Sequence, residues 1–121
     1  DFDGDGRDDI FWYGRGGAAD YLWHGRRDRS FDASNRNMRY DRIPLSGNFN
    51  GDRRDDVFWY APGPARDQLW LGDRSRTFHG QSIANVRGSY GRAFVADLDG
   101  NGRDDIFWYA PGGGGDYIWW F

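Results

Sequence analysis

The sequence predicts an all-β protein made of four-stranded antiparallel sheets that repeat along the chain. Three observations predict it. One pattern occurs three times, at residues 1–13, 48–60 and 97–109. Each copy joins a loop rich in Asp, Asn and Gly to four large apolar residues, Ile or Val followed by Phe-Trp-Tyr. Lys and Glu, both common on helix surfaces, are absent, whereas Gly occurs 19 times, so helices are not expected.

The composition indicates a folded chain that has no basic surface for binding nucleic acid. Only 38% of the residues are hydrophobic, but 19% are aromatic and recur in phase with the acidic loops, unlike in disordered chains. There is no Cys, which excludes disulfides and thiolate metal sites. The net charge is -3 with Arg and Asp interleaved, so no basic face for nucleic acid is expected. No apolar run has the length of a membrane span, so membrane insertion is not expected either.

The spacing of the tryptophans defines the organisation of the domain. Trp12, Trp59 and Trp108 recur at intervals of 47 and 49 residues, and a second Trp follows each of them by 11 residues. Repeats of this length are typical of propeller blades. We therefore expect one repeat domain over residues 1–121, with a partial blade at 1–41, a full blade at 42–91 and a partial blade at 92–121.

The middle copy shows the expected strands of one blade. They span 43–47, 56–61, 68–71 and 77–82, and the turn-forming segments 62–66 and 72–76 separate the later ones. The strand after each acidic loop is apolar at every position, so both of its faces should be buried between neighbouring sheets. Together these features favour blades of a β-propeller. About two and a half repeats are present, whereas a closed propeller needs at least ~4 blades. Further blades, from the same protein or from other copies, are therefore expected partners.

The acidic loops have the residue types of a calcium site. Counting from the first acidic or amide residue of each copy, side-chain oxygens stand at loop positions 1, 3, 5 and 9, and the backbone carbonyl of position 7 is available. Ca²⁺ takes six to eight such oxygens, and Gly at position 6 permits the positive φ of a tight turn. We expect up to three Ca²⁺ ions, one in each loop. The predicted ligands are Asp1, Asp3, Asp5, Arg7 and Asp9; Asn48, Asn50, Asp52, Arg54 and Asp56; and Asp97, Asp99, Asn101, Arg103 and Asp105.

These loops have two other possible interpretations. An EF-hand needs an acidic ligand at position 12 and flanking helices, but position 12 is Trp in all three copies. A metal-free turn remains an alternative, because Asp, Asn and Gly favour turns anyway. If metal binds, the middle loop should be the weakest site, since Arg53 replaces the glycine of position 6 and only two of its ligands are acids. The third loop should be the best formed.

The acidic loop followed by Ile-Phe-Trp-Tyr resembles the FG-GAP/VCBS repeats of integrin-α-like β-propellers. This resemblance implies that the loop joins the first two strands of a blade and binds Ca²⁺. It also implies a non-enzymatic, extracellular module that recognises a glycan or a protein, although no signal peptide is present in the chain. Two alternatives remain open: a self-assembling structural repeat that forms a ring or filament, and an accessory module of a secreted hydrolase.

Most of the remaining distinctive residues have plain structural interpretations. Aromatic residues at equivalent strand positions are expected in the core, because burying each removes ~150–250 Å² from water. His24 and His79 have no histidine counterparts in the other copies and are expected to be surface or hydrogen-bonded residues rather than catalytic bases. No Ser-His-Asp arrangement or phosphate loop is present, so no catalytic residue is predicted. Aromatic residues near turns are the candidate ligand surface, namely Tyr21, Tyr117 and Trp120.

Overall fold

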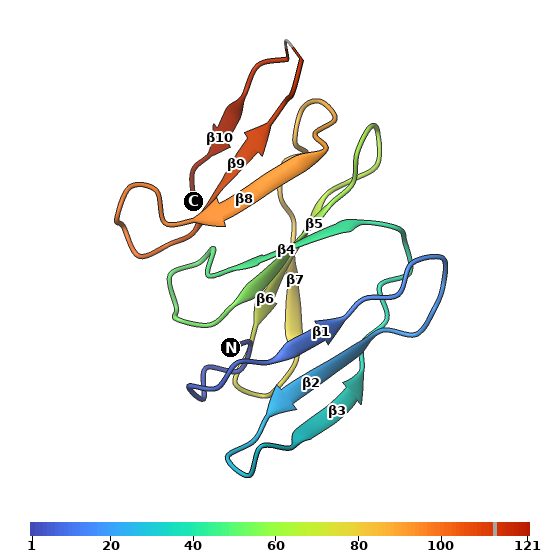
Figure 1. The fold of residues 1–121 in the computed structure, drawn as a ribbon, viewed down its shortest axis with the longest axis vertical. Coiled ribbons are helices and arrows are strands. Elements are labelled where there is room, and N and C mark those ends of the chain that lie inside the picture. The colour runs from blue at the N-terminus through green and yellow to red at the C-terminus, as the bar shows by residue number, and fades with distance from the viewer. Residues whose placement is uncertain (113) are drawn as a thin grey trace.

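The computed structural model describes residues 1–112 and 114–121, and within them it contains ten strands and no helix. The strands form three separate antiparallel sheets (Figure 1). The strands are β1 (Ile10–Trp12), β2 (Tyr21–Gly25), β3 (Phe31–Asn35), β4 (Ile43–Gly47), β5 (Asp56–Tyr60), β6 (Gln68–Gly72), β7 (Phe78–Gln81), β8 (Arg92–Ala96), β9 (Asp105–Tyr109) and β10 (Tyr117–Trp119). The all-β class is therefore confirmed. The described part of the chain has no helix with the length and apolar character needed to cross a bilayer.

Each sheet is a simple meander in which consecutive strands pair. The orders are β1-β2-β3, β4-β5-β6-β7 and β8-β9-β10. In the middle sheet Phe58 lies opposite Leu45 on one side and Leu69 on the other. The four strands predicted for this repeat are confirmed to within one residue at each end. The limits of the blades at residues 41 and 91 stay predictions.

The middle sheet lies between the other two (Figure 1), and a separate cluster of buried apolar residues forms on each of its faces. Successive side chains of a strand point to opposite faces. Accordingly, Val57 and Trp59 of β5 belong to the cluster shared with the first sheet, and Phe58 and Tyr60 to the cluster shared with the third. All five residues of β5 are buried. The prediction that this strand is covered on both faces is correct for the middle repeat.

The same prediction is wrong for the first and last repeats. Ile10 and Trp12 of β1 are 37% and 49% exposed, and Tyr109 of β9 is 37% exposed. The equivalent middle residues, Val57 and Trp59, are 2% and 0% exposed. The reason is the stacking order, because among the described residues only the middle sheet has a sheet on each side.

A tyrosine at or directly after the end of the strand that follows the acidic loop, β1 or β5, holds the connection to the next sheet. The hydroxyl of Tyr13 accepts a hydrogen bond from the Arg42 backbone N–H at 2.7 Å and donates one to the Tyr40 carbonyl at 3.1 Å. The hydroxyl of Tyr60 does the same with the Tyr90 N–H at 2.9 Å and the Gly88 carbonyl at 3.1 Å. Each hydroxyl therefore finds both of its partners in the segment that leads into the following sheet.

In the first and second repeats a buried aspartate, Asp20 or Asp67, joins two loop segments through backbone hydrogen bonds. Asp67 accepts hydrogen bonds from the backbone N–H groups of Ala61 and Val86, at 2.7 and 2.6 Å. It thereby joins the turn before β6 to the segment after β7, and Asp20 makes the equivalent bonds in the first repeat. Burial raises the pKa of Asp67 above its usual range.

Candidate metal-binding loops

The three acidic loops have the same backbone conformation. Positions 4 and 6 have positive φ in every copy, between 67° and 85°. In the first and third loops both positions are glycine. In the middle loop position 6 is Arg53, with φ 67°, so the predicted left-handed conformation of a non-glycine residue is confirmed there. Such a conformation costs an L-residue roughly 1–2 kcal/mol.

The side chains at positions 1, 3 and 5 turn inward and cap the backbone of their own loop. The position 1 oxygen accepts the N–H of position 4 at 2.7, 2.9 and 2.7 Å in the three loops. The position 3 oxygen accepts the N–H of position 5 at 3.0, 2.9 and 3.0 Å. The position 5 oxygen accepts the N–H of the position 7 arginine at 3.0, 3.0 and 2.7 Å. These bonds bring together the predicted ligand side chains of positions 1, 3 and 5.

Carboxylate oxygens converge in the two loops that have at least three acids among the predicted ligands. Oxygens of Asp1, Asp3 and Asp5 lie within 4.8 Å of one another, and so do oxygens of Asp97, Asp99 and Asp105. In the middle loop two of these positions hold amides, and Asn50 donates to the carboxylate of Asp52 at 3.0 Å. A carboxylate oxygen that accepts one N–H keeps a further lone pair. The donor set therefore fits a hard cation such as Ca²⁺, which is bound through oxygen.

The arginine at position 7 has a second role that the sequence did not indicate. The guanidinium of Arg7 bonds to the carboxylate of Asp5 at 2.7 Å and to the Gly25 carbonyl at 3.3 Å. Arg54 makes the same pair of contacts with Asp52 and Gly72. Each guanidinium thus lies beside the acid at position 5 and fastens the loop to the last residue of β2 or β6. A cation at position 5 would share its carboxylate with this arginine.

The aspartate at position 9 also does more than the predicted closing of a ligand shell. Each of its two oxygens accepts one backbone N–H, one from loop position 2 and one from the far end of the neighbouring strand. For Asp56 the donors are Phe49 and Gly72, both at 2.9 Å. Asp9 and Asp105 make the equivalent bonds. Burial raises the pKa of Asp56 to about 6. The position 9 carboxylates therefore tie each loop to its own sheet.

The loops also join one sheet to the next. The N–H of Asp55 donates to the Asp1 carbonyl at 2.9 Å, and the main-chain nitrogen of Asp1 donates to the Asp55 carboxylate at 2.7 Å. Asp104 and Asn48 make the same reciprocal pair at 2.9 and 2.7 Å. Position 1 of one repeat is thus clamped by position 8 of the following repeat. Any ion held by position 1 would lie at this junction between sheets.

The two histidines differ from each other in the structure. His79 is at the surface, with its Nε2 3.0 Å from a carboxylate oxygen of Asp73, so the expectation for it is confirmed. The expectation for His24 is wrong, because His24 is 1% exposed and neither ring nitrogen has a hydrogen-bond partner among the described residues. It lies beside the first loop, next to Asp3 and Asp9. Sequence reasoning missed this because the equivalent residues, Leu71 and Trp120, carry no titratable group.

The predicted ligand surface does not form one site. Tyr21, Tyr117 and Trp120 are 42%, 48% and 54% exposed. Tyr21 belongs to the first sheet, whereas Tyr117 and Trp120 lie on or next to β10 of the third sheet, with the middle sheet between them (Figure 1). Tyr117 lines a hollow together with Tyr90 and Trp119, where the second and third sheets meet.

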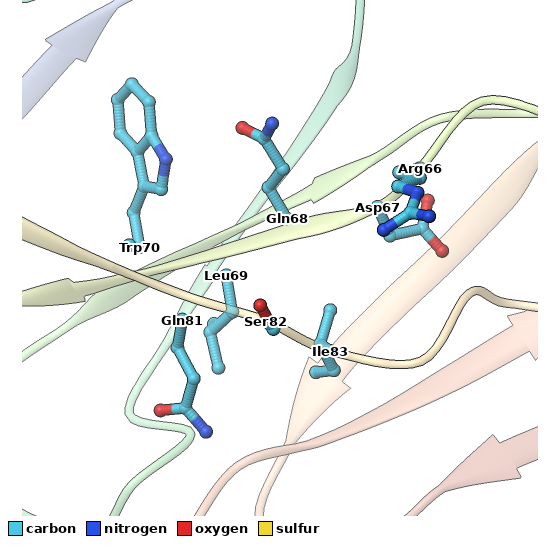
Figure 2. Close-up of a pocket in the computed structure, with 9 residues that line it drawn as sticks. Arg66, Asp67, Gln68, Leu69, Trp70, Gln81, Ser82 and Ile83 are labelled. Carbon is cyan, nitrogen blue, oxygen red and sulfur yellow. The ribbon is translucent and has the colours of Figure 1, made fainter.

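A shallow pocket lies on β6 and β7 of the middle sheet, and sequence reasoning did not find it. In Figure 2 Trp70 and Gln68 point to one side of the sheet, and Leu69 and Gln81 to the other. Gly80 is paired with Trp70, and a Cβ atom at Gly80 would meet nothing within 4 Å. The missing side chain of Gly80 thus leaves open space beside the indole. An indole with the amide of Gln68 on the same side suits a polar ligand with an apolar face.

Comparison with known proteins finds a match to a family model. The sequence model described as FG-GAP-like repeat matches residues 48–108, which is 61 of the 121 residues and includes two of the three acidic loops. No curated protein and no solved structure matches the chain.

Proposed function

This chain belongs to the FG-GAP-like repeat family, and on that premise we propose that it is a calcium-stabilised β-propeller repeat module. Its role would be recognition of a glycan or protein outside the cell, without catalysis. The family supports a propeller-type repeat, and the three antiparallel sheets agree with blades that are not closed into a ring. Calcium binding, secretion and the ligand are the parts that this proposal adds.

The single observation that carries the calcium proposal is the convergence of carboxylate oxygens in loops that also join the sheets. Several negative charges held this close repel one another unless a cation compensates them. An ion that binds only the folded loop stabilises the fold by RT ln(1 + [Ca²⁺]/Kd), about 2.7 kcal/mol at a hundred times Kd. The chain has no disulfide to provide this stabilisation instead.

Thermal unfolding with and without calcium tests the proposal. We expect millimolar Ca²⁺ to raise Tm relative to the chelated protein, and equal Mg²⁺ to raise it less, since Mg²⁺ gives up its waters reluctantly. Asp99→Asn should reduce the shift, because it weakens the third loop, whereas Asp28→Asn, in an exposed turn outside the loops, should not. An unchanged Tm, with no heat of binding in calorimetric titration, would reject the calcium proposal.

For recognition, the pocket beside Trp70 is a more specific candidate than the separated aromatic residues. Gln68 lies on the same side of the sheet as the indole and supplies an amide there, and Arg66 also lines the pocket (Figure 2). Glycan binding measured on an array should then fall for Gln68→Ala but not for Tyr21→Ala. Loss with Tyr21→Ala alone would instead place recognition at the first sheet.

A second candidate function, self-assembly, is favoured by one specific observation. The chain builds the same sheet-to-sheet contact twice, and it exposes both halves of that contact at its outer faces. On the first sheet these are Asp8, Ile10 and Trp12, which are equivalent to the interface residues Asp55, Val57 and Trp59. On the third sheet they are Leu98 and Tyr109, equivalent to the buried Phe49 and Tyr60. A second copy fits this contact, in a head-to-tail arrangement that gives a ring if it closes and a filament if it does not.

Light scattering coupled to size exclusion tests this second candidate. We expect a mass above the 14.0 kDa of one chain, and Trp12→Arg should return it to a monomer because a charge would enter the contact. Tyr40→Arg, at an exposed tyrosine in the connection between β3 and β4, is the matched control and should leave the mass unchanged. A monomer at every concentration tested would eliminate self-assembly.

A further inference from the structure

His24 is a buried polar residue that the function proposed above does not use. It lies in β2, it is 1% exposed, and both of its ring nitrogens lack a hydrogen-bond partner among the described residues. The middle repeat has Leu71 at this position, so an apolar side chain suffices for the packing. Burying a polar group without a partner costs free energy, and such exceptions in a structure call for a cause.

The ring points at two buried carboxylates of the first loop. Its Nδ1 lies 3.3 Å from Oδ2 of Asp9 and 3.6 Å from Oδ2 of Asp3. The side chains of Asp3, Asp9 and His24 are 4%, 1% and 2% exposed. One ligand atom from each residue lies within 4.8 Å of the other two. The imidazole therefore faces carboxylate oxygens without forming an aligned hydrogen bond to either.

These separations are those of atoms that share an ion. Two ligands placed 2.0–2.1 Å from Zn²⁺ at a tetrahedral angle are about 3.3 Å apart. The oxygens are also held in place as ligands usually are. Asp9 accepts the backbone N–H groups of Phe2 and Gly25, and Asp3 accepts the Nε of Arg76 at 2.9 Å. Partners of this kind orient ligating carboxylates.

The donor set differs from that of the other two loops. An imidazole nitrogen with carboxylate oxygens suits zinc and its first-row neighbours, whereas oxygen-only sets suit calcium. We propose that Asp3, Asp9 and His24 form a site for a transition-metal ion of the Zn²⁺ type, which distinguishes the first loop from the second and third. This inference rests on the proposed role of the first loop in binding metal, but it assigns that loop a different ion.

The competing arrangement is an imidazolium held between the two carboxylates with no metal. Arg76 already contacts Asp3, and its side chain also bonds to Asp32 at 2.9 Å. Since the Arg76 side chain is 41% exposed, it can leave Asp3 when a divalent ion enters. The two arrangements differ in whether a metal binds through the histidine, and this is what the experiment measures.

The test uses the whole chain saturated with Ca²⁺, titrated with Zn²⁺ in a calorimeter and with Co²⁺ as a coloured probe. We expect one equivalent of Zn²⁺ to bind and Co²⁺ to develop visible absorption. His24→Leu, which copies the middle repeat, should weaken Zn²⁺ binding by roughly a hundredfold or more, since even outer partners of a metal ligand are worth 10–100-fold. His79→Leu, at the exposed histidine, is the matched control and should bind as the unmutated chain does.

A measurement on the unmutated chain keeps the test independent of how the variants fold. The ring signals of His24 in NMR should shift in proportion to Zn²⁺ up to one equivalent, while those of His79 stay in place. Zn²⁺ binding that is equal in His24→Leu and the parent, or unmoved His24 signals, would overturn the inference. If Ca²⁺ still raises Tm in that case, the proposed function stands. If Zn²⁺ binds through His24 but Ca²⁺ has no effect on Tm, the calcium proposal fails and the inference holds.

Discussion

The strained residue of the middle loop gives the most direct test of how these loops are built. Arg53 occupies position 6 with φ 67°, where the sister loops have Gly6 and Gly102 with φ 85° and 84°. The left-handed conformation costs a residue with a Cβ roughly 1–2 kcal/mol, of which the larger unfolded-state entropy of glycine returns about 0.5–1 kcal/mol. We therefore expect Arg53→Gly to raise the free energy of unfolding by about 1 kcal/mol, or Tm by about 4 °C.

A second variant separates backbone strain from charge. Arg53→Ala removes the exposed guanidinium but keeps a Cβ, so it should gain none of this stability. Gly102→Ala is the reverse control, because a Cβ there meets nothing within 4 Å and only the φ of +84° opposes it. It should lose about 1 kcal/mol. The assay is urea unfolding of all three variants in excess chelator. Equal stability of Arg53→Gly and Arg53→Ala would refute the argument from strain.

Three further predictions follow from contacts in and around the sheets. Gly72→Ala should prevent stable folding or lower Tm severely, because the new Cβ would lie 2.3 Å from the Asp55 carbonyl oxygen and 2.5 Å from that of Phe2. Gly80→Ala is the control: it lies on the neighbouring strand with open space around it and should change Tm little. Similar losses of Tm in both variants would contradict this account. Asp67→Asn should lower the free energy of unfolding by about 1–3 kcal/mol, measured by urea unfolding at pH 7. Each oxygen of Asp67 accepts a backbone N–H, and the amide of Asn would turn its NH₂ toward one of these donors. An unchanged urea midpoint would show that these bonds contribute nothing. In calcium-free protein the free energy of unfolding should fall as the pH rises from about 4 to about 6. The pKa of Asp56 is about 6 in the folded chain and 3.8 in the unfolded chain, so the folded chain holds more protons in this pH range. The slope should be smaller in Asp56→Asn, and an equal slope would assign the effect to other groups.

The sequence predicted the strands well where repetition and alternation agree. The apolar run from Val57 to Tyr60 gave β5, and the turn residues on each side gave its neighbours to within one residue. What the pattern could not give was the burial of each copy. Trp12 and Trp59 have the same local sequence, but they are 49% and 0% exposed. The difference arises from the sheet that covers each of them, and local sequence carries no record of that.

The loops were recognised from their spacing, but the partners of their side chains were not. Spacing indicated that Asp56 could reach an ion, whereas the structure shows both of its oxygens engaged by the N–H groups of Phe49 and Gly72. Gly72 is 16 residues away in the chain, so this bond depends on the return of β6 alongside β5. The prediction for His24 was wrong for two reasons: the equivalent residues in the other repeats carry no titratable group, and its neighbours Asp3 and Asp9 come from a different segment of the chain.

The hydroxyls of Tyr13 and Tyr60 have a consequence for any attempt to shorten, lengthen or shuffle this chain. Each of them belongs to one sheet but holds the segment that enters the next sheet. The unit that can be exchanged is therefore not a single sheet, because its boundaries are shifted along the chain relative to those of the sheet. A splice placed between sheets, just before residue 42 or residue 90, would separate Tyr13 or Tyr60 from the segment that it holds. A splice in the turn at residues 62–66 would likewise part Tyr60 from residues 88–90. A splice in the loop at residues 48–55 would keep each tyrosine in the same piece as the segment that it holds, so chimaeras joined there should keep both contacts.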